Sequence, residues 1–132
     1  MNILFLEKAI TRLEEGWVRY QQDISDAQIR DGLIQRFEFT YDLSCKTLKR
    51  YLESASPTPE EYDQMPFADI IRSANEQGLL LSNWPKWRQY RDMRNKTSHT
   101  YDEDIALAVV VEIPEFLKEA QFLRNTLRER LT

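Results

Sequence analysis

Apolar residues recur through the first half of the chain at alternating spacings of four and three positions. Because an α-helix turns once every 3.6 residues, this spacing places them on one side of a helix. The pattern predicts a helix over about residues 4–22 and, with Ser25 or Asp26 as its N-cap, a long helix over about residues 26–54. The apolar positions of the two helices are Leu6, Ile10, Leu13, Trp17 and Tyr20, then Ile34, Phe37, Tyr41, Cys45, Leu48 and Leu52.

A proline-rich, acidic stretch follows these two helices. Residues 54–66 contain Pro57, Pro59 and Pro66 beside three carboxylates, which predicts a loop with room for one short turn. Pro66 suits the first position of a short third helix, because the N–H that it lacks would be unpaired there anyway. Gly78 then provides a stop, since glycine readily adopts the left-handed conformation that ends many helices.

Two more helices are predicted in the second half of the chain. Asn83 can cap a fourth helix that runs toward residues 94–101, and Asp102 can cap a fifth. Pro114 should bend or interrupt the fifth helix near its middle. The apolar positions of the fifth helix are Ile105, Val109, Ile113, Phe116, Ala120, Leu123 and Leu127.

Stripes with a four-three repeat stay aligned when helices pack nearly antiparallel. We therefore predict an all-α fold, an up-and-down helical bundle of four to five helices that forms one domain over residues 1–132. The aromatic content of 11% and the length of the second helix hint at surface that a monomer leaves uncovered. A core rich in aromatic rings is the simpler explanation and is favoured from these facts alone.

Composition excludes several classes of protein. With 42% hydrophobic and 30% charged residues, the chain has the composition of a soluble helical protein rather than a disordered one. No apolar run approaches the ~20 residues that cross a bilayer, and no signal peptide is present, so a cytoplasmic protein without membrane contact is expected. One Cys and one His cannot supply a disulfide or a four-ligand zinc site, and three scattered glycines form no nucleotide-binding loop. Neither a metal nor a cofactor is expected.

Charge is distributed unevenly. The net charge of −4 argues against general binding of nucleic acid, which depends on neutralising phosphates. Residues 86–96, however, hold five cations and only Asp92, a local charge of +4 that leaves −8 for the rest of the chain. This stretch indicates a localised anion site.

Residues 94–101, with the sequence RNKTSHTY, bring together an arginine, the only histidine and a tyrosine. On an unbroken helix His99 would point about 140° away from Arg94. The two side chains therefore converge only if the helix ends near His99 or if a second protomer supplies one of them.

Arginine and histidine together suit phosphodiester cleavage. Histidine exchanges protons near neutral pH, and arginine holds a phosphate and offsets the charge that grows on it. In RNA the 2′-hydroxyl of the substrate is the nucleophile, so this chemistry needs no metal and no protein nucleophile. The alternative is that a lone histidine near a helix end is a surface or capping residue, and spacing alone favours that alternative.

Glu38, Asp42 and Lys46 stand four residues apart on one face of the second helix. The simplest interpretation is a solvated ladder of charge pairs, worth roughly 0.2–0.5 kcal/mol each. The functional alternative is a polar wall of a groove or an interface.

Two segments together resemble the HEPN superfamily, and in particular its nucleotidyltransferase substrate-binding branch, which is related to HepT toxins. The segments are residues 34–53, IQRFEFTYDLSCKTLKRYLE, and residues 94–101. The second fits the R-x4-H-x-Y pattern of the family at all three fixed positions, with a polar residue, Asn95, after the arginine. The order of the helices and the length of the chain also match.

The resemblance implies a homodimer in which Arg94 and His99 of both protomers line a shared cleft as the ribonuclease residues. It also implies a partner, a small MNT-type nucleotidyltransferase, that can attach AMP to Tyr101. The phosphate of that AMP would occupy the basic pocket and so block RNA. We expect four neighbouring residues to contact the substrate: Arg91, Asn95, Lys96 and Ser98.

Two functions remain open. By resemblance the chain is the toxin of a toxin–antitoxin pair, a metal-independent endoribonuclease that its cognate MNT-type antitoxin neutralises. The alternative is a noncatalytic substrate-binding subunit of a two-component nucleotidyltransferase, with Arg94 and His99 as ligand contacts. The complete set of Arg, His and Tyr favours the first function, because a pure scaffold does not need the imidazole. A purely structural helical scaffold ranks last.

Overall fold

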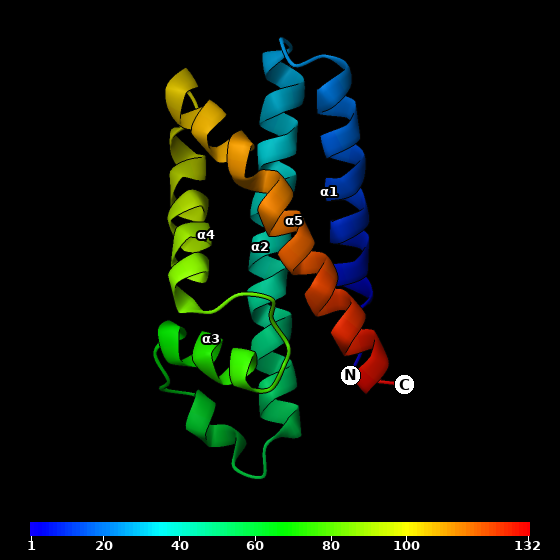
Figure 1. Ribbon diagram of the computed structural model, residues 1–132, viewed down its shortest axis with the longest axis vertical. Helices are drawn as coiled ribbons and strands as arrows, with labels where there is room; N and C mark the ends of the chain where they lie inside the picture. The colour runs from blue at the N-terminus through cyan, green and yellow to red at the C-terminus, as the bar shows by residue number, and fades with distance from the viewer.

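The first two helices form where the apolar spacing predicts them. In the computed structural model, which describes residues 1–132, α1 spans Leu4–Gln22 and α2 spans Ala27–Ala55. The side chain of Asp26 caps α2 by accepting hydrogen bonds from the backbone N–H groups of Gln28 and Ile29. The two helices lie side by side along most of α1 (Figure 1).

The second half of the chain covers this pair with three more helices. A short 3-10 turn, η1 (Pro59–Tyr62), precedes α3 (Phe67–Glu76), and α4 (Trp84–Lys96) follows. A second 3-10 turn, η2 (Thr97–His99), leads into α5 (Glu103–Arg130), which crosses α2 diagonally toward α1 (Figure 1). All the regular elements are helical, so the molecule is an all-α helical bundle.

The predicted caps and stops mostly form. Asn83 and Asp102 cap α4 and α5 with their side chains, and Gly78 has a positive φ of 76° just after α3. Pro66 differs from the prediction: it precedes α3 instead of opening it, because its ψ of 148° is extended rather than helical. Pro114 does not interrupt α5. Buried residues before and after the proline hold the neighbouring turns of the helix against the core.

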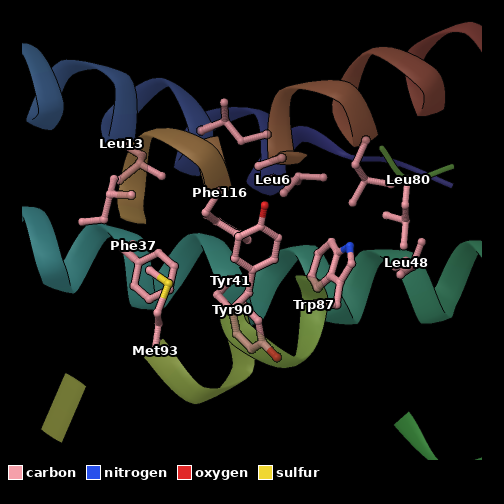
Figure 2. Close-up of a cluster of buried hydrophobic side chains, with 14 of the residues drawn as sticks. Leu6, Leu13, Phe37, Tyr41, Leu48, Leu80, Trp87, Tyr90, Met93 and Phe116 are labelled. Atoms are coloured by element: carbon pink, nitrogen blue, oxygen red, sulfur yellow. The ribbon is translucent and has the colours of Figure 1, made fainter. Parts of the chain in front are cut away.

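Aromatic rings fill the centre of the bundle. Phe116 of α5 meets Phe37 of α2 and Tyr90 of α4 edge to face, with ring centroids 5.1 and 5.2 Å apart. Figure 2 shows Tyr41 and Trp87 in the same cluster, between α2 and the helices that cover it. A ring-rich core therefore accounts for much of the aromatic content.

Some large apolar side chains remain on the surface. Phe5 is 75% exposed, Phe39 is 53% exposed and Tyr101 is 86% exposed. Phe5 and Phe39 lie outside the apolar stripes of α1 and α2, and Tyr101 lies in the turn between η2 and α5, so the core does not use these residues. None of the helices is both long and apolar enough to cross a membrane.

Candidate functional site

The helix that carries Arg94 ends before it reaches His99. α4 stops at Lys96, and the chain continues as the 3-10 turn η2. The Thr97 hydroxyl donates to the carbonyl of Arg94 at 2.8 Å, and the N–H of Asp102 donates to the carbonyl of His99 at 3.1 Å. The first of the two conditions for bringing Arg94 and His99 together, an end of the helix near His99, is thus met.

Arg94 is held in place by α2. Its Nε and Nη2 donate to the two carboxylate oxygens of Asp42 at 2.9 and 3.1 Å, and its Nη2 lies 3.4 Å from Glu38 Oε1. The remaining nitrogen, Nη1, donates to the Thr97 hydroxyl at 3.3 Å. The hydrogen bonds to Asp42 raise the pKa of Arg94 above its usual value, and their bidentate geometry fixes the orientation of the guanidinium.

This arrangement corrects the interpretation of Glu38, Asp42 and Lys46 as a ladder of charge pairs along α2. Both carboxylates turn toward Arg94 of α4, and Lys46 has no carboxylate within 4.0 Å. Asp42 and Lys46 also line a groove between α1 and α2, whereas Glu38 does not. The three residues therefore have three different environments.

His99 and Tyr101 emerge together from the turn after α4. Both side chains are exposed, and the Tyr101 hydroxyl lies 3.5 Å from Nδ1 of His99. The two rings meet edge to face with centroids 6.1 Å apart. Within one chain no hydrogen bond joins His99 to Arg94, whose nitrogens are all directed to Asp42, Glu38 and Thr97.

The four residues expected to contact substrate lie around the end of α4. Asn95, Lys96 and Ser98 are exposed, and Lys96 forms no ion pair. Arg91 lies over the ring of Trp84, with its guanidinium carbon 5.0 Å from the ring centroid. The first three are free to meet a ligand, while Arg91 is partly occupied by the ring.

The only cysteine is not part of this surface chemistry. Burial raises the pKa of the Cys45 thiol to about 12, against a smaller lowering by its hydrogen bond with Tyr41. The thiol is therefore protonated at neutral pH and a poor nucleophile. No group of three His, Cys, Asp or Glu side chains is arranged to hold a metal ion.

Known proteins are similar to this chain in both sequence and arrangement of helices. The family model described as "Nucleotidyltransferase substrate binding protein like" matches residues 1–129. The chain belongs to this family. Membership agrees with the resemblance carried by residues 34–53 and 94–101, since the family is the branch to which those segments point.

One relative in the family is a Haemophilus influenzae protein named "Probable ribonuclease HepT". It is 40% identical over 126 residues, which are 95% of this chain and 86% of the relative. A protein of this family named as a probable ribonuclease thus has nearly the same length and a closely similar sequence.

Two solved structures have the same fold. A Haemophilus influenzae protein, described as revealing the fold of a substrate binding domain of a nucleotidyltransferase, superposes with a TM-score of 0.90 at 38% identity. The match covers 96% of this chain and 99% of that one. A Thermus thermophilus protein superposes with a TM-score of 0.68 at 30% identity, covering 93% and 98% of the two chains.

Proposed function

We propose that this chain is a HEPN-type toxin, a metal-independent endoribonuclease that a cognate MNT-type nucleotidyltransferase antitoxin neutralises. The observation that carries the proposal is the placement of the R-x4-H-x-Y residues. Arg94 is fixed by two hydrogen bonds to Asp42, and His99 and Tyr101 stand exposed on the turn that follows. The 40% identity with a probable ribonuclease adds support.

In the proposed reaction the imidazole of His99 accepts the proton of the 2′-hydroxyl. The 2′-oxygen then attacks the adjacent phosphorus, and the bond from phosphorus to the 5′-oxygen breaks. A second imidazole, from His99 of the other protomer, gives its proton to the departing 5′-oxygen. The products are a 2′,3′-cyclic phosphate and a 5′-hydroxyl, and Arg94 offsets the charge on the phosphoryl oxygens.

A homodimer is part of this proposal because one chain leaves the constellation incomplete. No hydrogen bond joins Arg94 to His99 within the chain, and a single imidazole cannot both accept and donate a proton in one concerted step. A second protomer placed against the end of α4 supplies the missing groups. The shared cleft then lies over residues 94–101.

We further propose Tyr101 as the residue that the antitoxin modifies. Its hydroxyl is on an 86% exposed side chain and lies beside His99. Attack of the phenol oxygen on the α-phosphorus of ATP forms the AMP ester and releases pyrophosphate. The new phosphodiester then carries a negative charge into the region where the RNA phosphate binds, which silences the enzyme.

The second candidate is a noncatalytic substrate-binding subunit of a two-component nucleotidyltransferase. The observation in its favour is that Glu38 and Asp42 both lie within ion-pair distance of Arg94 and give this cluster a net negative charge. A phosphate must compete with two carboxylates for the guanidinium. This candidate predicts binding without cleavage.

Cleavage of total cellular RNA by partner-free protein in EDTA separates the two candidates. The wild type and His99→Ala are purified in parallel, with mass spectrometry to show that Tyr101 carries no AMP. Lys118→Gln, a position on α5 outside the site, serves as the control. We expect cleavage by the wild type and the control only, with cyclic-phosphate ends. Equal cleavage by His99→Ala contradicts the assignment, and no cleavage by any of the three supports the binding subunit.

A further inference from the structure

A groove of about 740 Å³ runs between α1 and α2. Its α1 wall contains Lys8 and Arg12, and its α2 wall contains Arg36 and Lys46. No residue of α5 lines it, so the groove lies on a part of the α1–α2 pair that α5 leaves open. From Gly32 to Lys46 its α2 wall extends about 21 Å at 1.5 Å per residue.

The groove is strongly cationic in an acidic protein. None of its four cations, Lys8, Arg12, Arg36 and Lys46, has a carboxylate within 4.0 Å; the ion pairs of the chain form elsewhere. The only acidic residue in its lining is Asp42, whose two oxygens already bind Arg94. An anionic ligand would therefore meet positive charge that the protein itself does not neutralise.

Two exposed aromatic rings share the groove with these cations. Phe5 of α1 is 75% exposed and Phe39 of α2 is 53% exposed, and both line it. Cations along a track together with exposed rings are the combination that binds single-stranded nucleic acid, because the cations meet phosphates and the rings stack on bases. The carboxylates of an acidic protein surface would meet the cations but would leave the two rings without stacking partners.

Gly32 keeps one part of the groove open. A Cβ built at Gly32 meets no heavy atom within 4 Å, so neither packing nor close approach of another helix requires glycine there. Glycine inside a helix is less favourable than alanine. Because Gly32 has no side chain, it leaves space in the wall of the groove.

Asp42 connects the groove to the proposed catalytic site. Its side chain lines the groove and at the same time holds Arg94 through two hydrogen bonds. Lys46 lies one helical turn beyond Asp42. The groove therefore borders the residue that orients the Arg94 guanidinium, although Arg94 itself does not line the groove.

We propose that the α1–α2 groove binds single-stranded RNA beside the scissile phosphate, with Lys8, Arg12, Arg36 and Lys46 on its phosphates and Phe39 stacked on a base. This proposal rests on the proposed function for the identity of the ligand. Binding itself requires no cleavage, and the two are tested separately.

The first test measures binding of a labelled 2′-O-methyl oligoribonucleotide, which cannot be cleaved because its 2′-oxygen is blocked. Fluorescence anisotropy over a series of salt concentrations compares Lys8→Gln/Lys46→Gln with Lys49→Gln/Lys118→Gln. The second pair lies outside the groove and changes the net charge equally. We expect Lys8→Gln/Lys46→Gln to bind the oligonucleotide more weakly than the wild type does. The slope of log affinity against log salt concentration should also fall by about 1.4, since each contact with a single-strand phosphate contributes about 0.7. The control pair should match the wild type.

A second comparison leaves the charge unchanged. Gly32→Gln should fill the groove and raise Kd, while Gly32→Ala should leave Kd near the wild-type value. Phe39→Ala should raise Kd by about 5-fold or more through loss of stacking. Circular dichroism and size-exclusion chromatography on every variant show whether the fold and the oligomeric state are retained.

The outcomes separate this proposal from the proposed function. Weaker binding by the groove variants supports the groove even if the wild type cleaves no RNA, a result that would contradict only the ribonuclease. If the wild type cleaves RNA but the groove variants keep its Kd and salt slope, the proposal that RNA binds in the groove is wrong. The proposal is also wrong if the wild type fails to bind the oligonucleotide at low salt, or if the groove variants change the oligomeric state but not the binding.

Discussion

Asp42 of α2 and Arg94 of α4, 52 residues apart, are joined by two hydrogen bonds of 2.9 and 3.1 Å. This bidentate pair ties together the two segments that carry the family resemblance. It fixes the plane of the guanidinium, and a phosphate would have to compete with Asp42 and Glu38 for its N–H groups. The long helix α2 is therefore part of the candidate site as well as of the core.

The pair should contribute modestly to stability and strongly to orientation. Because the Arg94 side chain is 29% exposed, we expect a double-mutant cycle of Asp42→Asn and Arg94→Gln to give a coupling of about 1 kcal/mol in urea unfolding. Asp42→Asn should also lower RNA cleavage, because it releases the guanidinium from its fixed plane. A coupling near zero, or cleavage at the wild-type rate by Asp42→Asn, would show that the pair does not position Arg94.

The sequence predicts more of the fold than of the site, and the reason is periodicity. Helix positions and caps depend on residues close in the chain, so Asp26, Asn83 and Asp102 are recognisable as caps from their neighbours. The pairing of Asp42 with Arg94 depends on how α2 and α4 are rotated against each other, and the spacing of residues within α2 carries no information about that rotation. The four-residue spacing predicts that Asp42 pairs with residues of α2, whereas in the structure it pairs with Arg94 of α4.

The groove was hidden from the sequence for a similar reason. Phe5 and Phe39 fall outside the apolar stripes, which indicates exposure at each position separately. Only the packing of α1 on α2 brings the two rings and the cations near them to one groove.

Pro114 shows a different limit of prediction from sequence. A proline disfavours a helix locally, but buried neighbours such as Ile113 and Phe116 hold α5 together.

Tyr101 provides a test of the proposed control by a nucleotidyltransferase. Coexpression with the cognate partner, in cells that supply ATP, should add the mass of AMP to the wild type and abolish its cleavage of RNA. Tyr101→Phe lacks the phenol oxygen and should stay unmodified and active in the presence of the partner. Intact-protein mass spectrometry and an RNA cleavage assay measure the two effects; equal modification of the two proteins would place the acceptor elsewhere.

The two helical glycines should respond differently to alanine. Gly32→Ala adds a Cβ that meets nothing and should stabilise the protein by about 0.8–1.0 kcal/mol, because alanine favours the helix. At Gly16 the added Cβ would lie 3.1 Å from Arg36 Cδ and 3.4 Å from Leu33 Cδ1, so the gain should be smaller or lost. Thermal unfolding of Gly16→Ala, Gly32→Ala and the wild type compares their stabilities. A larger gain in stability for Gly16→Ala than for Gly32→Ala would contradict the packing described between α1 and α2.

Glu119 should make stability depend on pH. Burial of its side chain raises its pKa, although the N–H of Leu81 donates to it at 2.7 Å. The folded state therefore binds this proton more tightly than the unfolded state. The proton stabilises the fold at low pH, and that contribution disappears as the pH rises through the raised pKa.

Comparison with Glu119→Gln isolates this contribution. Lowering the pH from 8 to 5 should stabilise the wild type relative to the variant, because only the wild type gains a proton that its folded state binds more tightly than its unfolded state. Urea unfolding at both pH values provides the measurement. A difference that is independent of pH, or one that moves in favour of the variant at low pH, would contradict a raised pKa for Glu119.

Attack by the 2′-hydroxyl of RNA, with His99 at the reacting centre, is the central step of the proposed function. The most direct measurement uses two oligonucleotides that differ only by a 2′-hydroxyl or a 2′-hydrogen at one mapped cleavage position, each incubated in EDTA with the wild type and with His99→Ala. We predict that the wild type cuts only the oligonucleotide with the hydroxyl, leaving a cyclic phosphate, and that His99→Ala cuts neither. Cleavage of the 2′-deoxy oligonucleotide at that position, or cleavage by His99→Ala at the wild-type rate, would contradict the account.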